Sequence, residues 1–382
     1  MNILYISEIE PFLINTGERL RAKNLINSLT EFSDKVFAIV GNLPKRDQSV
    51  PENLFCYQMP LLFDQNRRWN NFIHLFKRNT ELVTLIQKII ETEKIDIAFL
   101  DYNFIGNYIE IFNTNNIKVI YGTHNVQSRL NLQTPAKTLT DKLYRILRYR
   151  LEMFHERYYL KKADAIIAVS EQDLIYYKKN YKKTRSYLIP NYIDERQYNS
   201  EDYYFKKRHV RFIMSGNFNA FQNKYGMAWF LKNVWDKELN MCIEGIFVGH
   251  GSIKAFNEID APYKNGISAL GTVKDVKEYI TESMVAIIPL LHGSGTRLKC
   301  IEAMALKTPI ISTSIGVEGI DHDGTIVIAN SAEEFKKALL DVCAYGSDKA
   351  AKAYQIFLKK YSSLSNTEAL KKIIVSTINE EV

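Results

Sequence analysis

The stretch "IIPLLHGSGTRLKCIEAMALKTPIISTSIGVEGI" occupies residues 287–320 and decides the fold that we expect. It begins as an apolar run, breaks at Gly293 and Gly295, continues as a helix-like segment through Ala305, and returns to an apolar run at Pro309–Ser312. A strand, a glycine loop, a helix and a second strand in this order are typical of a parallel sheet that binds a phosphate at the amino end of a helix. The stretch therefore predicts an α/β domain with an anion site at the glycine loop.

The same alternation of apolar runs and helical stretches extends along the chain, which favours parallel, doubly wound sheets. It is interrupted by the polar stretch Asn191–His209, which we interpret as a linker. We therefore expect an α/β protein with two doubly wound Rossmann-like domains, residues 1–195 and 196–382, that face a central cleft, with the C-terminal helix able to pack back on the first domain. The expected strands are Asn2–Ser7, Lys35–Gly41, Ile95–Asp101, Ile117–His124 and Ala163–Ser170, then "VRFIMSG", "CIEGIFVGHG", "GISALGTV", "MVAIIPLL", "TPIISTS" and "TIVIAN", followed by a helical tail from Ala332.

Composition narrows the class of protein. The net charge of +7 indicates an anionic partner, and the alternative is an ordinary basic surface. No apolar run approaches the roughly 20 residues of a membrane span, and the first residues lack signal-peptide features, so we expect a cytoplasmic location. The four cysteines lie far apart, which favours isolated thiols over disulfides or zinc. No nucleic-acid-binding module is found, so we expect no nucleic-acid partner.

Charged residues follow the glycine loop in an order that fits a nucleotide. Arg297 and Lys299 lie at the amino end of a helix, where cations oppose the dipole unless an anion such as a diphosphate is bound. Glu302 lies about one and a half turns into that helix, where a carboxylate can accept two hydrogen bonds from ribose hydroxyls. The alternatives are a tight turn with solvated basic side chains and an ordinary exposed helix glutamate.

Seven segments together resemble the retaining, nucleotide-sugar-dependent glycosyltransferases of GT-B fold known as glycosyl transferases group 1, above all the branch that makes bacterial capsule, O-antigen and exopolysaccharide. The resemblance covers nearly the whole chain, in order. It implies that the first domain binds the acceptor and the second binds the donor. The segments are "GSGTRLKCIEAMALKTPIISTSIGVEGI", "THNVQSRL" (Thr123–Leu130), "AIIAVSEQD" (Ala165–Asp173), "LIPNYID" (Leu188–Asp194), "IMSGNFNAFQNKYGMAWFL" (Ile213–Leu231), "FVGHG" (Phe247–Gly251) and "LGTVKDVKEYI" (Leu270–Ile280).

The resemblance also implies site residues, with two departures. Ser294 stands where the family commonly has the first of two glutamates, and Asn217 stands where it often has an arginine. We therefore expect Arg297 to take over part of the diphosphate charge. The catalytic candidates are His124, Arg297 and Glu302; the donor-binding candidates are Gly216, Asn217, Lys224, Gly249, Val273, Gly293, Ser294, Gly295, Thr296 and Lys299; the acceptor-binding candidates are Gly17, Arg19, Arg21 and Asn125.

The expected activity is that of a hexosyl- or related glycosyltransferase, with a nucleotide-diphosphate sugar as co-substrate, no cofactor and no metal requirement. A glycan or lipid-linked molecule is the expected acceptor. Basic, apolar segments at 66–79 and 142–162 also fit peripheral contact with an anionic membrane, or core-facing helices with basic outer faces. The competing functions are a noncatalytic sugar-nucleotide-binding partner in a polysaccharide assembly complex and an epimerase or phosphorylase of the same fold.

Overall fold

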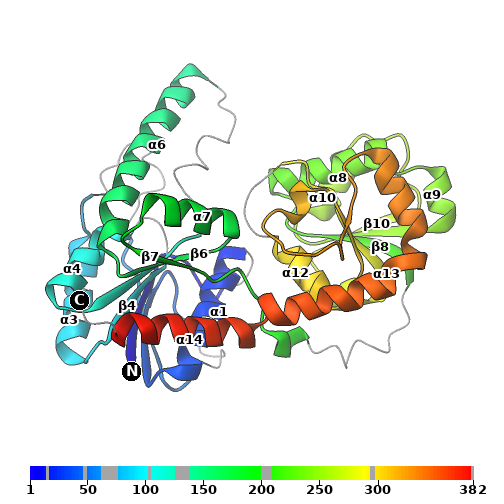
Figure 1. Ribbon diagram of the computed structural model, residues 1–382. Helices are drawn as coiled ribbons and strands as arrows, with labels where there is room; N and C mark the ends of the chain where they lie inside the picture. The colour runs from blue at the N-terminus through cyan, green and yellow to red at the C-terminus, as the bar shows by residue number, and fades with distance from the viewer. Residues whose placement is uncertain are drawn as a thin grey trace. The chain divides into compact units, whose positions relative to one another are not determined.

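The chain divides into two compact units, which are described here one by one. The computed structural model describes residues 1–13, 17–45, 50–61, 76–101, 105–124, 138–198, 209–292 and 297–379. Unit 1 comprises Met1–Asn191 and Asn366–Val382, and unit 2 comprises Tyr192–Ser365 (Figure 1). The first division therefore falls within four residues of the boundary expected at 195/196, and the last part of the chain returns to unit 1.

Unit 1 is built on a sheet that has, among the described residues, seven parallel strands in the order β3-β2-β1-β4-β5-β6-β7. Its strands are β1 (Asn2–Ser7), β2 (Lys35–Val40), β3 (Leu54–Gln58), β4 (Ile97–Asp101), β5 (Lys118–Gly122), β6 (Ala165–Ala168) and β7 (Arg185–Leu188). Its helices are α1 (Gly17–Phe32), α3 (Thr80–Thr92), η1 (Gly106–Tyr108), α4 (Ile109–Thr114), α6 (Leu139–Tyr159), η2 (Leu160–Lys162), α7 (Glu171–Asn180) and most of α14 (Ser363–Asn379).

The apolar pattern explains why these segments are strands and helices. The β1 segment is apolar at successive positions, and Ile3, Leu4, Tyr5 and Ile6 are all fully buried, as in a parallel strand covered on both faces. In α1 the buried positions recur with helical spacing, so one face packs on the sheet. The five strands expected in this unit are confirmed; β1 has the expected bounds, and the other four are shorter than expected by one to four residues.

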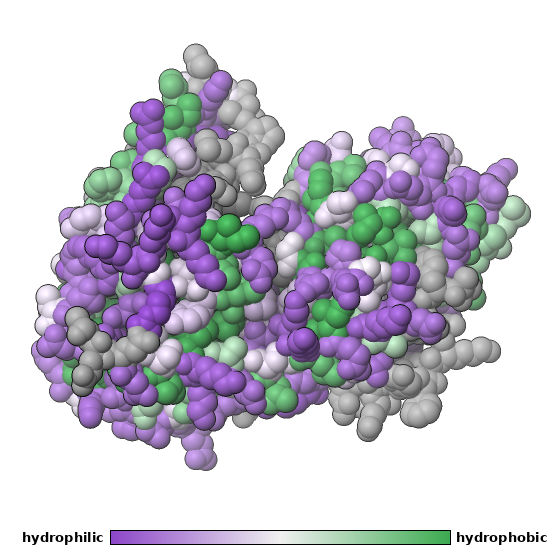
Figure 2. All heavy atoms as spheres, in the orientation of Figure 1, coloured by the Kyte–Doolittle hydropathy of each residue, from purple (hydrophilic) through white to green (hydrophobic). Residues whose placement is uncertain are grey.

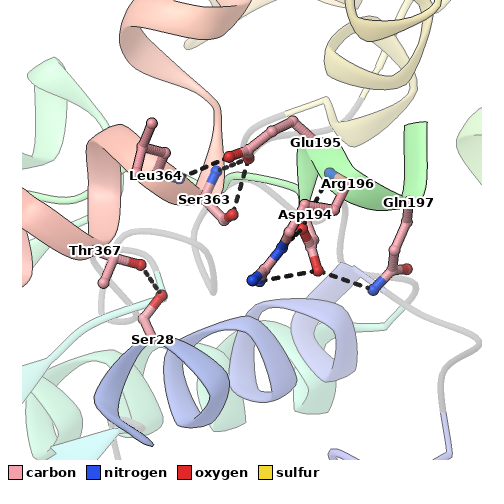
Figure 3. A network of polar contacts seen from close by, with 8 residues as sticks. All are labelled: Ser28, Asp194, Glu195, Arg196, Gln197, Ser363, Leu364 and Thr367. Carbon is pink, nitrogen blue, oxygen red and sulfur yellow. Dashed lines mark hydrogen bonds and ion pairs between the residues drawn. The ribbon is translucent and has the colours of Figure 1, made fainter. Parts of the chain in front are cut away.

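The start of α14 is fixed by polar contacts (Figure 3). The Glu195 carboxylate accepts hydrogen bonds from the backbone N–H groups of Ser363 and Leu364 at 2.6 and 3.2 Å, which satisfies two donors at the amino end of the helix. Further along, the hydroxyls of Thr367 and Ser28 in α1 are hydrogen-bonded at 2.7 Å inside unit 1. The last helix is thereby attached to unit 1.

Unit 2 contains a second sheet, which has six parallel strands among the described residues, in the order β10-β9-β8-β11-β12-β13. Its strands are β8 (His209–Ser215), β9 (Glu244–Val248), β10 (Ile267–Gly271), β11 (Ser283–Ile288), β12 (Ile310–Ser312) and β13 (Val327–Ile328). Its helices are η3 (Glu195–Tyr198), α8 (Phe221–Asn233), α9 (Lys237–Cys242), α10 (Ser252–Glu258), α11 (Val276–Glu282), α12 (Leu298–Ala305), η4 (Ile315–Val317) and α13 (Ala332–Lys360).

An aromatic cluster fills the core of unit 2. Phe212 in β8 is fully buried, and its ring centroid lies 5.0 Å from that of Phe230, 5.4 Å from that of Trp235 and 6.1 Å from that of Phe247. A Cβ added at Gly245 would lie 2.2 Å from the Phe212 ring, so β9 needs a glycine there.

None of the described helices is long and apolar enough to cross a membrane.

Truncation of Phe212 tests this core. Phe212→Ala leaves a cavity among three rings, so we expect it to lower the free energy of unfolding of unit 2 by about 3–5 kcal/mol. The matched control is Phe221→Ala, because that side chain is 67% exposed and its removal should change stability by about 0.5 kcal/mol or less. Denaturant unfolding measures both, and equal losses in the two variants would contradict the packing.

Candidate functional site

The strand order places one ligand-binding edge in each unit. The order reverses between β1 and β4 in unit 1 and between β8 and β11 in unit 2. Ligands of open parallel sheets bind beyond the carboxyl ends of the strands at such a reversal. Gly216 directly follows β8, so it lies at the reversal in unit 2. Gly293, Ser294, Gly295 and Thr296 themselves lie outside the described residues.

Two glycines bring the ends of β8 and β9 into close contact. Gly216 and Gly249 have φ angles of +149° and +131°, which side-chain-bearing residues rarely adopt. A Cβ added at Gly249 would lie 2.1 Å from the Gly216 carbonyl oxygen, and a Cβ added at Gly216 would lie 3.1 Å from the Lys299 Nζ. The turn therefore requires glycine and sits directly beside an ammonium group.

Lys299 is the cation that the structure places at this turn. Its Nζ donates to Asn223 Oδ1 at 2.7 Å, and Asn223 Nδ2 donates to the Asn217 carbonyl at 2.9 Å. Burial lowers the pKa of Lys299 to about 8, because the charged form has lost most of its water. An anion bound beside Gly216 would stabilise the charged form. Asn223, which sequence reasoning missed, orients this lysine.

Lys224 does not contribute to this contact. Its Nζ is 2.6 Å from Glu258 Oε2, and both side chains are roughly half exposed. The expectation that Lys224 binds the donor stays a prediction, and the structure pairs this side chain with Glu258. Its neighbour Asn223 faces Lys299 instead, because adjacent helical residues point about 100° apart.

Arg297 caps the amino end of α12, as expected for a residue at the mouth of that helix. Its side chain is buried, its Nε donates to the Ile315 carbonyl at 3.3 Å, and a terminal nitrogen lies 3.9 Å from Glu318. Burial lowers the pKa of this guanidinium, with Glu318 acting in the opposite direction. The alternative of a solvated helix residue is wrong, and the contact with a diphosphate stays a prediction.

Glu302 lies on α12 and is half-buried, so it is not an ordinary exposed helix glutamate. The Tyr198 hydroxyl donates to its Oε1 at 3.1 Å. Burial raises the pKa of Glu302, while Tyr198, Lys299 and Lys277 act to lower it. Val273 lies in the loop between β10 and α11 and is partly buried.

In unit 1, His124 belongs to a buried polar cluster at the strand ends. His124 Nε2 is 3.2 Å from Asp101 Oδ1, and the Tyr5 hydroxyl donates to Asp101 Oδ2 at 2.6 Å. Burial acts to raise the pKa of Asp101, but the charge and hydrogen bond of His124, with Arg21 and Tyr5, bring it below its ordinary value. Sequence reasoning missed Asp101 and Tyr5, although Asp101 ends a strand that it did predict.

The acceptor-binding candidates occupy different environments. Arg21 is buried and donates to the carbonyls of Ile189 and Pro190 at 3.1 and 3.2 Å, so the alternative of a solvated first turn is wrong for it. Arg19 forms an ion pair with Glu10, and Gly17 is the exposed first residue of α1. Asn125 lies outside the described residues.

The described residues contain no group of three or more histidine, cysteine, aspartate or glutamate side chains that could hold a metal ion. The expectation of metal-independent chemistry stays a prediction.

Models of two glycosyltransferase families match parts of the chain. The model of Glycosyltransferase Family 4 matches residues 21–197, and that of Glycosyl transferases group 1 matches residues 209–345. An uncharacterized 44.6 kDa protein in the cps region of Klebsiella pneumoniae is 25% identical over 178 residues. That match covers 44% of this chain and 45% of the relative, so the chain matches less than half the length of that curated relative.

Solved structures show the same fold over almost the whole chain. Sucrose-phosphate synthase from Thermosynechococcus elongatus has a TM-score of 0.74 at 13% identity, with 98% of each chain covered. HepE from Anabaena, in complex with UDP, has a TM-score of 0.66 at 12% identity, with 98% of this chain and 100% of that chain covered. The architecture is thus the two-domain GT-B fold, as expected.

Removal of the Asp101 charge tests the cluster in unit 1. A carboxylate whose pKa is depressed in the folded state stabilises the protein above its ordinary pKa of 3.8 and loses that effect as pH falls through the folded value. We expect Asp101→Asn to cost about 1.5–3 kcal/mol at pH 7, with a difference from the parent that shrinks below about pH 4. Denaturant unfolding at pH 7 and below pH 4 measures the difference in stability between variant and parent, and Asp34→Asn is the control because Asp34 is exposed. A difference that is the same at both pH values would contradict this assignment.

Proposed function

We propose that this chain transfers a sugar from a nucleoside diphosphate sugar to a glycan or lipid-linked acceptor, and the matches of residues 21–197 and 209–345 to glycosyltransferase models support this. Unit 2 binds the donor, and unit 1 binds the acceptor. The transfer retains the anomeric configuration, needs no metal and contributes to a cell-surface polysaccharide. The similarity to a protein of a cps region supports this pathway.

The environment of Lys299 carries the proposal. A nucleoside diphosphate leaving group needs positive charge that is already in place when the glycosidic bond breaks. Lys299 supplies it beside the Gly216 turn, and burial strengthens its interaction with an anion. The complexes of HepE with UDP and with UDP-glucose make UDP the first nucleotide to test.

Two side chains of the same helix complete the donor site. Arg297 lies at the amino end of α12, where its charge adds to the positive end of the helix dipole. Glu302 accepts hydrogen bonds from the ribose hydroxyls. The helix would thus hold both the diphosphate and the ribose of one nucleotide.

His124 acts on the sugar in this proposal. Asp101 accepts from Nε2 and thereby fixes the orientation and tautomer of the ring. Positive charge develops at the anomeric carbon as the diphosphate leaves, and an imidazole held by a buried carboxylate stabilises that charge. Asp101 and Tyr5 are therefore positioning residues for His124.

The acceptor side includes a surface suited to an anionic membrane. Helix α6 extends beyond the rest of its unit, and apolar and charged residues lie next to one another on its outer part (Figures 1 and 2). Leu143, Leu147 and Phe154 are 62%, 42% and 59% exposed. Tyr159 at the end of α6 is buried, so the last turns of the helix face the core, as in the alternative reading, and the earlier turns present apolar side chains to solvent. With Lys142 and Arg150 exposed beside them, the helix fits peripheral contact at the inner face of the cell membrane.

Turnover separates the proposed enzyme from a noncatalytic sugar-nucleotide-binding protein. We expect the purified protein to release UDP from a UDP-sugar in the presence of EDTA. His124→Ala should keep UDP affinity and lose turnover by about a hundredfold or more, because it removes stabilisation of developing charge only.

A coupled assay for UDP release measures turnover, and calorimetry measures affinity. Tight UDP binding without turnover in the parent would favour the noncatalytic alternative. Full activity of the His124 variant would remove His124 from the chemistry, and a product that is an epimer of the sugar nucleotide would favour an epimerase.

The pH dependence of UDP binding tests Lys299. In the free protein its pKa is about 8, and a bound diphosphate raises it. UDP affinity should therefore fall by up to tenfold per pH unit as the pH rises above about 8, and binding in that range should take up a proton. Calorimetry in buffers of different ionisation enthalpy measures both effects. Lys299→Met should bind weakly and without proton uptake; a parent-like pH profile in that variant would assign the titration to another group.

A further inference from the structure

We propose that Tyr198 and Lys277 are positioning residues that present Glu302 to the ribose and thereby set the preference of the donor site for ribonucleotides over 2′-deoxyribonucleotides. The inference rests on the proposed function, because it assumes that Glu302 binds a nucleoside diphosphate. Neither residue was among the site residues expected from the sequence.

The contacts of Tyr198 define its role. This residue ends η3, and its hydroxyl donates to Glu302 Oε1 at 3.1 Å across 104 positions of the chain. Among the described residues, Tyr198 is the one hydrogen-bond donor to this carboxylate. One oxygen of Glu302 is therefore held by the phenol, which fixes the carboxylate plane, while Oε2 keeps its capacity to accept from a ribose hydroxyl.

Lys277 holds η3 in place over Glu302. Its Nζ donates to the Gln197 carbonyl at 2.9 Å and lies 5.2 Å from the centroid of the Tyr198 ring, within range of a cation–π interaction. Asp275 fixes the lysine in turn, because its Oδ1 caps the Lys277 N–H at 2.9 Å and its Oδ2 is 3.5 Å from Nζ. The loop that carries Val273 thus leads directly into the support of Glu302.

The other end of η3 is also anchored. Glu195 accepts from the hydroxyl and the backbone N–H of Ser363 at 2.8 and 2.6 Å, and Asp194 is bonded to Arg196 and Gln197 within the turn (Figure 3). A short helix fixed at both ends can hold a tyrosine hydroxyl at a set position, as a positioning role requires.

The charged groups around Glu302 make its pKa depend on Tyr198 and Lys277, which an experiment can measure. The carboxylate faces Tyr198 from η3, Lys277 and Asp275 from α11, and Lys299 from its own helix. Burial raises its pKa, and the Tyr198 hydrogen bond is the first of the influences that lower it. Without the hydroxyl, the carboxylate would protonate at higher pH and could no longer accept two ribose hydrogen bonds there.

The experiment compares UDP with 2′-deoxyuridine diphosphate by calorimetry in the parent and in Tyr198→Phe. We expect the parent to bind UDP more tightly than 2′-deoxyuridine diphosphate. In Tyr198→Phe the ratio of the two affinities should be about tenfold smaller, which corresponds to the loss of one hydrogen bond to a charged group. The pH below which UDP affinity declines should also move upward. Inorganic pyrophosphate should bind both proteins equally.

Two further variants complete the design. Tyr263→Phe is the matched control, because Tyr263 accepts from Asn240 Nδ2 at 2.7 Å elsewhere in unit 2, and it should keep the parental ratio. Lys277→Met frees η3 without altering the tyrosine and should also lower the ratio. If the parent prefers UDP and both Tyr198→Phe and Lys277→Met keep the parental ratio and pH profile, the inference is overturned while the donor site stands. A parent that binds no nucleoside diphosphate would instead overturn the proposed function, and the inference with it.

Discussion

The burial of one ammonium group, that of Lys299, is the constraint on which the donor half of this protein depends. A half-buried lysine is costly unless its charge is compensated, and here burial lowers its pKa to about 8. Asn223 Oδ1 accepts a hydrogen bond from the Lys299 Nζ at 2.7 Å. A Cβ at Gly216 would lie 3.1 Å from the Lys299 Nζ, so the glycine lets the ammonium group approach the end of β8 closely. We propose that a bound diphosphate compensates the remaining cost.

Unit 1 also buries a charged group, but there the group is negative. A carboxylate, Asp101, is fully buried, and it is compensated by a tyrosine hydroxyl and a histidine rather than by a ligand. Such a satisfied network is rigid, because each member would lose its partner on moving. The first unit therefore holds an imidazole in a fixed position, whereas in the second unit we propose that a bound diphosphate compensates the charge of Lys299. This division matches the assignment of sugar chemistry to one unit and leaving-group binding to the other.

The sequence was sufficient for the fold because both sheets are parallel and buried on both faces, so their central strands are continuous apolar runs. It failed at β3 and β7, which are the edge strands of the first sheet: Phe55 is 40% exposed, and the "RSYL" of β7 has no fully buried position. Lys299, Arg297 and Glu302 were found because they follow one glycine loop in sequence. Asn223, Asp101 and Tyr198 were not, because their importance comes from partners 76, 23 and 104 positions away. Lys224 was selected because the sequence shows its charge. The sequence could not show that its side chain is paired with Glu258, 34 positions away.

Hydrogen exchange of the intact protein with and without saturating UDP tests the central claim most directly, since it locates the nucleotide without assuming turnover. The account predicts slowed exchange in unit 2 at the β8–α8 turn around Gly216 and along α12 from Leu298 to Ala305, and an added effect at η3. In Lys299→Met the same segments should be protected less at equal UDP concentration. Protection confined to unit 1, or equal protection in the parent and the Lys299 variant, would contradict it.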